Sequence, residues 1–483
     1  MKRLMIFILT LSVLSAVLFS CKHEAETTAE TVTETQGRET EAVITETETG
    51  SETEPVGEEA VLKRYFIYRI WNFSKRELED FKYNVDEAVK SGFNAIKVHM
   101  PWHRMQSADK TIDYAELDSL LDYVTEEKGL PAAVSIDFAR RYGDGMLSDD
   151  ELMRDINGRL CVGDVNYERA ALSFCSDSAT EKAVSFYKDA VTHINGKYGD
   201  KILLYLPAFT QYCETEYWCA GQYDYSDAAL TKFRKALSDK FSDISGLNEV
   251  TGKDFASFDD VKAPPCTDSS PLGVMWYNFR HEMLKSFIDR LADVQKSAAP
   301  DSKLALQLGS VFDEASSLRC TLRFADLCEK ADILWIDDAP LYDHKFSMDY
   351  VRSSLPDGVE IAQEIDGPLQ YNASPEAYLD QGLTSYGRGA VYLSIANWTV
   401  DENYRRYENV WEQISSTWLT DDPPDVVMID ENSAAQTASV YDLFKKKSPS
   451  TFISKYNKLL KNSAAVKITV VDDMKEHEQK VKK

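Results

Sequence analysis

The chain has 483 residues and a formal net charge of −26. A balance this acidic argues against nucleic acid as a partner, because phosphate binding requires a basic surface. Aromatic residues make up 11% of the sequence, which is compatible with stacking on sugars, although core packing accounts for most aromatics in any domain.

The N-terminus has the pattern of an export signal. Two basic residues precede an uncharged run from Leu4 to Phe19, and the stretch Leu18–Cys21 resembles a bacterial lipobox. The apolar run is too short and wrongly flanked for a spanning helix. We therefore expect residues 1–21 to be a lipoprotein signal peptide. Acylation of Cys21 would anchor the protein to the membrane of a bacterial cell envelope, facing outside the cytoplasm. An ordinary secretion signal that contains a cysteine is the alternative.

A strongly acidic segment follows the signal. Residues 22–60 hold twelve glutamates against Lys22 and Arg38, and nearly all the rest is Thr, Ala, Gly and Ser. So few large apolar residues cannot bury enough surface to offset the entropy of ordering. We expect a disordered, self-repelling tether.

Beyond the tether, short apolar runs alternate with amphipathic, helix-length segments. Eight strands that are each followed by a helix predict a TIM (β/α)8 barrel over residues 61–419, with an insertion after strand four. A doubly wound sheet would present a Gly-rich phosphate turn after its first strand, and Trp71–Ser74 is not one. The strand candidates are Tyr65–Trp71, Ala95–Met100, Ala132–Phe138, Ile202–Leu206, Leu304–Leu308, Ile333–Ile336, Val359–Gln363 and Ala390–Ile395. The helix candidates are Ser74–Ser91, Tyr114–Lys128, Thr180–Tyr198, Trp276–Ala298, Leu318–Lys330, Ser374–Tyr386 and Asn403–Leu419.

The C-terminal part differs from the barrel pattern. Residues 420–483 contain a Pro423-Pro424 break and two short strand-like runs around helical segments. We expect a small appendage or a partly ordered tail, and we expect the charged end, Met474–Lys483, to fray.

The cysteines indicate neither a disulfide framework nor a metal site. Seven remain after Cys21, an odd number that leaves at least one free thiol in an exported chain, and no Cys-x-x-Cys pair occurs. We expect buried thiols, no structural metal and no cofactor. The seven are Cys161, Cys175, Cys213, Cys219, Cys266, Cys320 and Cys328.

Acidic residues follow two of the predicted strands. Glu214 and Glu216 close strand four, and Glu364 closes strand seven. The carboxyl ends of all strands meet at one rim of a barrel, where barrel enzymes place their catalytic groups. Paired carboxylates there suit glycosidic bond cleavage. Acids that merely face solvent at strand ends are the alternative.

A family resemblance gives these acids roles. Glu214–Tyr217 resembles the Glu-Asn-Glu-Tyr signature of family 35 β-galactosidases and the Asn-Glu-Tyr of family 42. The following segment, with Phe233, Ile244–Asn248 and Val261–Pro264, is similar to family 42 over about residues 200–300. The resemblance implies a retaining glycoside hydrolase of the large barrel clan, acting on an oligo- or polysaccharide. Its acid/base on strand four would be Glu216, and its nucleophile on strand seven would be Glu364. Glu214 is the alternative acid.

Two departures from the family matter. Members usually carry Asn before the acid/base, where it can bind the 2-hydroxyl of the sugar, and this chain has Thr215. The family's trimerisation and C-terminal domains also have no counterpart in residues 420–483.

Further residues at predicted strand ends and beside the acids are expected to bind the carbohydrate substrate. The tryptophans would stack on sugar rings or pack at the rim. The two histidines, which lack a nearby third ligand, are expected to donate hydrogen bonds and not to bind metal. These residues are Trp71, His99, Trp102, His103, Asp137, Tyr217, Trp218, Asp337 and Trp398.

Two rival functions remain open at this point. A barrel without catalysis could bind glycans at the cell surface, although it would not need both strand-end acids. An inverting enzyme like the β-amylases would use Glu214 as the acid. Its carboxyl groups would lie about 6.5–9.5 Å apart, against about 5–5.5 Å in a retaining enzyme. The oligomeric state is left open.

Overall fold

The computed structural model describes residues 63–70, 78–162, 169–210, 212–366, 373–397, 400–419, 428–430, 437–446, 449–460 and 464–479. The predicted signal peptide and tether, residues 1–60, therefore lie outside the described residues. The chain divides into two units, Met1–Glu59 and Ala60–Lys483, and all described residues belong to the second.

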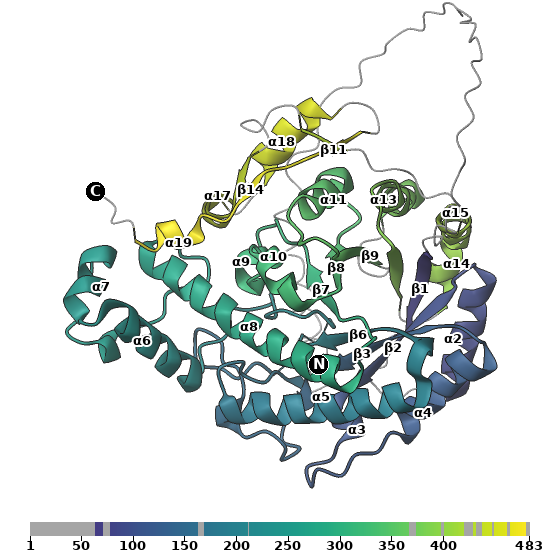
Figure 1. Cartoon of the computed structure of the whole chain (residues 1–483), viewed down its shortest axis with the longest axis horizontal. Helices are drawn as coiled ribbons and strands as arrows, with labels where there is room; N and C mark the ends of the chain where they lie inside the picture. The colour runs from purple at the N-terminus through teal and green to yellow at the C-terminus, as the bar shows by residue number, and fades with distance from the viewer. Residues whose placement is uncertain are drawn as a thin grey trace, which may run out of the picture. The chain divides into compact units, whose positions relative to one another are not determined.

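Eight parallel strands form a nearly closed barrel, which confirms the predicted fold class (Figure 1). Their order in the sheet is β6-β3-β2-β1-β10-β9-β8-β7, so β6 and β7 are the two ends. A parallel bridge between Tyr205 and Leu304 joins these ends. The barrel strands are β1 (Tyr65–Ile70), β2 (Ala95–Pro101), β3 (Ala132–Asp137), β6 (Ile202–Ala208), β7 (Ala305–Gly309), β8 (Ile333–Asp338), β9 (Glu360–Asp366) and β10 (Tyr392–Asn397).

Helices surround the barrel at nearly the predicted places. Two predictions were wrong in detail. Leu318–Lys330 is not a single helix but forms the short pieces α9 (Ser316–Arg319) and α10 (Phe324–Leu327) and a final 3-10 turn, and Asn403–Leu419 is divided between two helices, α14 (Glu402–Arg406) and α15 (Glu408–Trp418). The others are α2 (Leu78–Lys90), α3 (Trp102–Met105), α4 (Ala115–Asp122), α5 (Asp177–Tyr198), α6 (Asp227–Phe241), α7 (Ile244–Thr251), α8 (Pro271–Ala298), α11 (His344–Arg352) and α13 (Pro375–Gly387). A two-residue antiparallel pair, β4 (Arg140–Arg141) and β5 (Arg169–Ala170), lies in the loops between β3 and α5.

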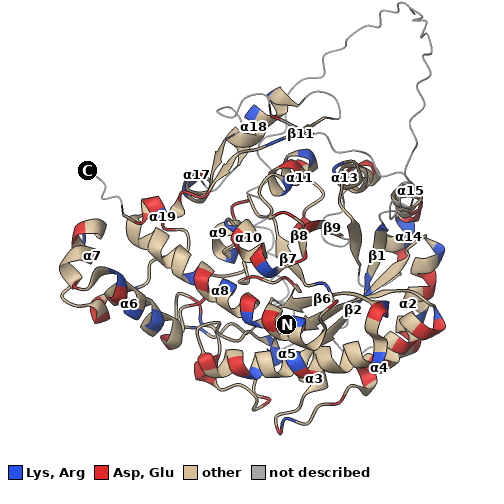
Figure 2. Ribbon diagram, viewed as in Figure 1, with Lys and Arg blue, Asp and Glu red and all other residues tan. Residues whose placement is uncertain are grey.

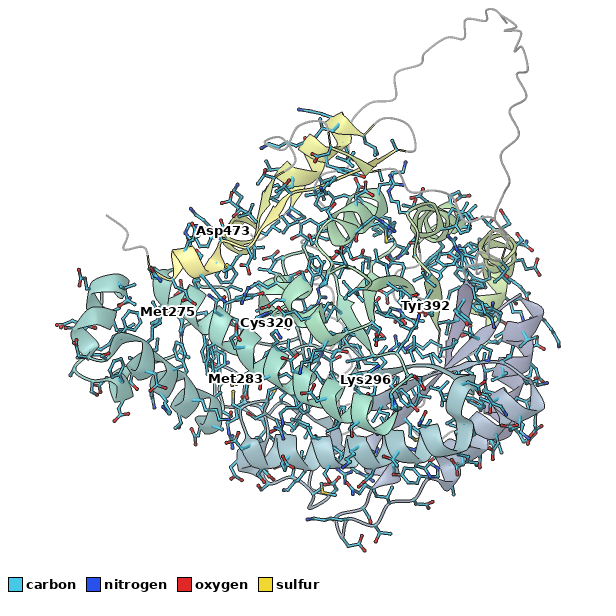
Figure 3. The ribbon with its side chains drawn as sticks, viewed as in Figure 1. Met275, Met283, Lys296, Cys320, Tyr392 and Asp473 are labelled. Carbon is cyan, nitrogen blue, oxygen red and sulfur yellow. The ribbon has the colours of Figure 1, made fainter. Side chains whose placement is uncertain are left out.

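The insertion after strand four has a small core of its own. Helices α6 and α7 pack on the N-terminal half of α8, with Phe233, Leu247 and Trp276 buried between them. Met275 and Met283 on α8 belong to the same cluster (Figure 3). Such a separate apolar cluster lets the insertion extend the barrel without disturbing its interior.

The barrel interior has two chemically different layers. Side chains alternate between the two faces of a strand, so every second residue points inward. Toward the amino ends of the strands the inward residues are apolar, and Trp335 fills the centre among small residues such as Ala95 and Ala362. Toward the carboxyl ends they are polar or charged, as at Lys97 and Glu364. The same alternation therefore builds a dry core and, above it, a polar site.

The C-terminal part folds as an appendage. Its strands pair in parallel, β11 (Met428–Ile429) with β13 (Ala465–Val466) and β12 (Ala438–Ser439) with β14 (Val470–Val471). The helices described in this part of the chain are α17 (Val440–Lys446), α18 (Ser450–Leu459) and α19 (Met474–His477). The expected fraying from Met474 onward was wrong for Met474–His477, because that stretch is helical and Met474 is buried.

A buried carboxylate of the barrel fastens this appendage. Asp349 of α11 accepts hydrogen bonds from the Tyr456 hydroxyl at 2.6 Å and from the Val466 amide at 2.8 Å, both in the appendage. It also accepts one from Arg388 at 3.0 Å. Within the appendage, Asp473 (Figure 3) joins β12 to α17 by accepting bonds from the Ser439 hydroxyl at 2.7 Å and the Tyr441 amide at 2.9 Å.

Candidate active site

The candidate site is the polar layer at the carboxyl ends of the barrel strands. In sheet register, Glu364 on β9 lies beside Asp337 on β8 and beside Ser394 on β10. Charged residues otherwise lie mainly on the outer helices, but acidic residues also appear along β8 and β9 (Figure 2). The rim on which the sequence placed the catalytic acids thus carries a dense group of ionisable side chains.

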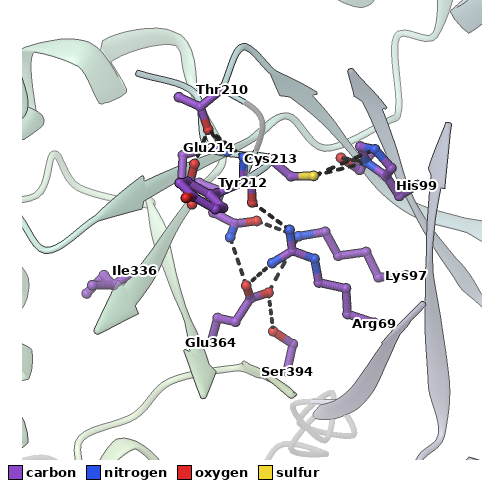
Figure 4. A network of polar contacts seen from close by, with 12 residues as sticks. Arg69, Lys97, His99, Thr210, Tyr212, Cys213, Glu214, Ile336, Glu364 and Ser394 are labelled. Carbon is purple, nitrogen blue, oxygen red and sulfur yellow. Dashed lines mark hydrogen bonds and ion pairs between the residues drawn. The ribbon is translucent and has the colours of Figure 1, made fainter. Parts of the chain in front are cut away.

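Glu364 is fully buried and is held by three hydrogen-bond donors and an ion pair with Lys97 (Figure 4). Its Oε1 accepts hydrogen bonds from a guanidinium nitrogen of Arg69 and, at 3.0 Å, from Gln307 Nε2. Its Oε2 accepts one from the Ser394 hydroxyl at 2.9 Å and lies 3.6 Å from Lys97 Nζ. These four side chains come from β1, β2, β7 and β10, so the surroundings of Glu364 form only when the barrel closes.

These donors keep Glu364 ionised. Burial by itself raises the pKa of a carboxyl group, but Arg69, followed by Lys97, Ser394 and Gln307, outweighs it and lowers the pKa of Glu364 below its usual range. Burial and the neighbouring Arg69 lower the pKa of Lys97 to about 8.

Gln363 and Asp366, the polar residues next to Glu364 in the sequence, do not keep it ionised. Gln363 donates its side-chain N–H to the backbone carbonyls of Ile336 and Glu364. Asp366 is itself a carboxyl with a raised pKa. The side chains that do hold Glu364 could not be grouped from the sequence, because they lie on four separate strands. The sequence did contain a signal for two of these groups, because Arg69 and Lys97 are charged residues within strands that are otherwise largely apolar.

The other two acids lie beyond the end of strand four, which corrects the expectation that they close it. Strand β6 ends at Ala208, and the amides of Phe209 and Thr210 donate to the Glu214 carbonyl at 2.8 and 3.2 Å. These bonds close a tight loop. The chain then returns to the barrel seam, where the Thr215 amide donates to the Gln307 carbonyl at 2.6 Å.

Thr215 therefore has a structural position in this seam. Its hydroxyl donates to the Pro207 carbonyl at 2.7 Å and accepts from the backbone N–H of Gln307 at 3.2 Å. The side chain is fully buried. At the position where family members carry a sugar-binding Asn, this chain has a hydroxyl group that is already used to close the barrel.

Glu214 and Glu216 are both buried, but they have different partners. The Thr210 hydroxyl donates to Glu214, which shares the network that contains Arg69 and Glu364 (Figure 4). Glu216 accepts from the Gly309 amide at 2.9 Å and lies 3.0 Å from Arg319 Nε. Burial raises the pKa of Glu214, and it raises that of Glu216 well above its usual value, although Arg319 opposes the shift.

Asp337, which was predicted from the sequence to bind the substrate, lies beside Glu364 in the sheet. A hydrogen bond links it to Asp366. Burial raises the pKa of both groups, and the negative charge of Glu364 raises them further. The protonated form of each carboxyl is therefore favoured, because two negative charges in one buried place repel each other.

His99 and Asp137 lie on the neighbouring side of the interior. His99 Nε2 is 3.4 Å from Asp137 Oδ2, and its Nδ1 is 3.3 Å from the Cys213 sulfur. Arg169 pairs with Asp137. Burial, reinforced by Arg169, holds the pKa of His99 well below its usual value, so its imidazole is neutral. These residues position one another beneath the rim.

Several residues expected to bind substrate lie elsewhere. Trp102 is fully buried and stacks on Phe186 at a ring distance of 5.3 Å, so it is a core residue and that prediction was wrong. Tyr217 is also fully buried, with the guanidinium of Arg280 4.4 Å from its ring centre, and the prediction for it fails for the same reason. His103 is half-buried on α3, and burial lowers its pKa to about 4.

The remaining predicted site residues divide into two groups. Trp218 lines a small cavity together with Glu216, Thr210 and Arg169. Trp71 and Trp398 lie outside the described residues.

The seven cysteines that the structure describes are free thiols, and six of them are buried, while Cys219 is half-buried. In the described part of the chain, no cluster of three or more His, Cys, Asp or Glu side chains is arranged to hold a metal ion. No helix within the described ranges is long and apolar enough to cross a membrane.

A (β/α)8 barrel with one acid on strand seven and two acids in the loop after strand four resembles the architecture of the clan A glycoside hydrolases. The sequence match is more particular. Residues 165–353 match the model of glycoside hydrolase family 42, described as β-galactosidase. The chain is therefore family 42-like, as its Glu214–Tyr217 segment indicated.

Known proteins resemble the chain over different extents. It is 24% identical over 231 residues to the β-galactosidase LacZ of Heyndrickxia coagulans, covering 44% of this chain and 32% of that protein. The chain thus matches about a third of the length of this relative. A β-galactosidase structure from Marinomonas ef1 has a TM-score of 0.63 at 14% identity, covering 84% of this chain and 69% of the other. The catalytic domain of a β-amylase from Paenibacillus polymyxa has a TM-score of 0.58 at 15% identity, covering 74% and 100%.

Proposed function

We propose that this protein is a retaining glycoside hydrolase that cleaves oligo- or polysaccharides, with β-galactosides as the first substrates to test. The observation that carries the proposal is the opposite perturbation of the strand-end acids. The pKa of Glu364 is lowered, whereas the pKa values of Glu214 and Glu216 are raised. Glycosidic cleavage needs this division, with one carboxylate ionised and one carboxyl protonated near neutral pH.

In the proposed reaction, Glu364 attacks the anomeric carbon. Glu216 donates its proton to the glycosidic oxygen as the bond to the leaving group breaks, which leaves a glycosyl ester on Glu364. The Glu216 carboxylate then takes a proton from water, and the resulting nucleophile hydrolyses the ester with overall retention. We assign the acid/base role to Glu216 because its position matches the family motif and because Gly309 and Arg319 fix its carboxyl group.

Glu214 is the alternative proton donor, because it belongs to the same polar network as Glu364 (Figure 4). If it donated the proton in an inverting reaction, no glycosyl ester would form. The engagement of the Thr215 hydroxyl in the barrel seam further suggests that this protein reads the 2-position of the sugar differently from other family members.

Three variants test the proposal. Glu364→Ala should abolish hydrolysis of every substrate. Glu216→Ala should cripple substrates with poor leaving groups but largely spare formation of the glycosyl ester from activated aryl glycosides, which need no protonation to depart. Azide should then restore turnover of the Glu216 variant and give a glycosyl azide of retained configuration.

The other outcomes are equally informative. If Glu214→Ala shows this rescue instead, the acid/base is Glu214. If the wild-type protein turns over no aryl glycoside in a screen that varies only the sugar, the protein is a glycan-binding barrel and the proposal fails.

We also propose that the protein is exported and lipid-anchored through Cys21, on the basis of the lipobox-like sequence before that residue. The anchor would hold the barrel at the outer face of a bacterial membrane, where polysaccharide is available. Cys21→Ser should abolish acylation and release or misprocess the protein. Unchanged membrane association of that variant in detergent partitioning would contradict the anchor.

A further inference from the structure

An aromatic cluster accompanies the acids after strand four. We define it as Tyr212, Trp218 and Tyr223. The Trp218 ring lies parallel to that of Tyr223, with 6.1 Å between their centroids and an interplanar angle of 8°. The Tyr212 ring lies 6.4 Å from Trp218 at 58° and is 40% exposed. The cluster therefore extends from the buried ring of Tyr223 to the exposed ring of Tyr212.

The chain around this cluster fixes the positions of its rings. A Cβ atom at Gly221 would lie only 2.7 Å from the Tyr223 ring, so this glycine lets the ring pack against the backbone. One guanidinium nitrogen of Arg69 donates to the Tyr212 carbonyl at 2.7 Å, while another contacts Glu364. The same side chain thus holds both the proposed nucleophile and the backbone that carries the exposed ring (Figure 4).

Trp218 brings a hydrogen-bond donor to this place. Its ring lines the cavity that also contains the Glu216 carboxyl group. Its indole Nε1 is buried and meets no acceptor among the residues that the structure describes. A buried donor without a partner costs free energy that a ligand hydroxyl would recover.

Both candidate proton donors, Glu214 and Glu216, lie between Tyr212 and Trp218 in the chain. A proton donor must lie beside the glycosidic oxygen, on the side of the departing group. Aromatic side chains that flank such a donor are placed to receive that group.

We propose that Tyr212 and Trp218 form the subsite for the leaving group, and that this subsite takes a sugar ring. The ring stacks on the aromatic faces, and the Trp218 indole donates a hydrogen bond to one of its hydroxyls. The inference rests on the proposed function and adds to it the residues that bind the sugar on the leaving side of the cleaved bond. It holds whichever of the two glutamates is the acid.

The test compares two substrates that share one glycone, chosen as the sugar that the wild-type protein turns over in the aryl glycoside screen. For a galactosidase they are lactose, whose leaving group is a sugar, and β-galactosyl fluoride, whose leaving group has no ring. Tyr212→Ala and Trp218→Ala should each lower kcat/KM for lactose about tenfold, the value of one aromatic contact. Both should change kcat/KM for the fluoride less than about twofold.

Conservative variants separate stacking from hydrogen bonding. Tyr212→Phe keeps the ring and should lower kcat/KM on lactose much less than Tyr212→Ala does. Trp218→Phe keeps a ring but loses the donor and should cost about threefold to tenfold on lactose alone. Tyr83→Ala is the matched control, because Tyr83 is 48% exposed on α2, outside the aromatic cluster. It should affect neither substrate.

Equal losses on lactose and the fluoride would overturn the assignment, because they would place the rings at the glycone or make their role merely structural. Unchanged lactose kinetics in both alanine variants would also overturn it. If the wild-type protein turns over neither substrate, the proposed function fails, and binding of a galactooligosaccharide is then measured by calorimetry. Loss of that binding in Trp218→Ala supports the aromatic subsite, and retention overturns it.

Discussion

Arg69→Gln should change both the stability and the pH profile of this protein. The substitution removes a buried ion pair with Glu364 and a hydrogen bond to the Tyr212 carbonyl. Removing one partner of a buried ion pair typically costs about 3–5 kcal/mol, because the remaining charge has lost its compensation. Lys97 stays 3.6 Å from Glu364 and should keep the loss near the lower end of that range.

The sign of the pH effect follows from the lowered pKa of Glu364. In the wild-type protein its ionisation contributes stability that is present above the unfolded-state pKa of about 4.3 and is lost as the pH falls through the folded value. Without Arg69 the folded pKa rises. The acidic limb of the kcat/KM profile should therefore move to higher pH by at least about one unit, equivalent to about 1.4 kcal/mol.

Urea unfolding and a pH series of kcat/KM on an activated aryl glycoside measure the two effects. Arg290→Gln is the control, because Arg290 forms a largely exposed pair with Glu181 and should cost less than about 1 kcal/mol. If Arg69→Gln costs no more than this control and leaves the acidic limb in place, Arg69 does not hold Glu364 in its ionised form.

Three further predictions concern other parts of the chain. Burial raises the pKa of Asp366 to about 8, so the stability of the wild-type protein should fall as the pH rises from about 4 through 8. Asp366→Asn should reduce this dependence of stability on pH in urea unfolding. An unaltered dependence would contradict a protonated Asp366 in the folded protein. Asp349→Ala should lower the stability of the protein by about 3 kcal/mol and speed hydrogen exchange in the appendage, because it removes the carboxylate that binds Tyr456 and Val466. Exchange rates equal to those of the wild-type protein would contradict this role of Asp349. Deleting residues 24–58 should leave the melting temperature and activity on small soluble substrates unchanged, and a large loss of stability would move the domain boundary.

The sequence predicted the barrel because its strands are nearly continuous apolar runs. Strand ends were harder to predict. Strand β9 continues through Glu364 to Asp366, because inward-facing polar residues end an apolar run without ending the strand. Strand β6 stops at Ala208, because backbone bonds from Phe209 and Thr210 to the Glu214 carbonyl close a loop. Neither event leaves a mark in hydrophobic periodicity.

The sequence pointed to the acids of the candidate site but not to the side chains that hold Glu364. Glu364 ends an apolar run and therefore stood out, whereas Gln307 and Ser394 resemble ordinary polar interruptions of a strand. Their function depends on the register of strands that are distant in sequence. Two aromatic residues gave the opposite error. Trp102 and Tyr217 were expected to bind the substrate because they follow strand ends, but they are buried in the core.

The central claim is that Glu364 attacks the sugar, and trapping the glycosyl-enzyme tests it most directly. A 2-fluoro glycoside with an activated leaving group slows both steps but lets the ester accumulate, and peptide mass spectrometry locates the attached sugar. We predict one sugar per chain, attached to Glu364, and no label in the Glu364→Gln variant. A label on Glu214 or Glu216, or turnover of the parent aryl glycoside without any trapped ester, would contradict the assignment.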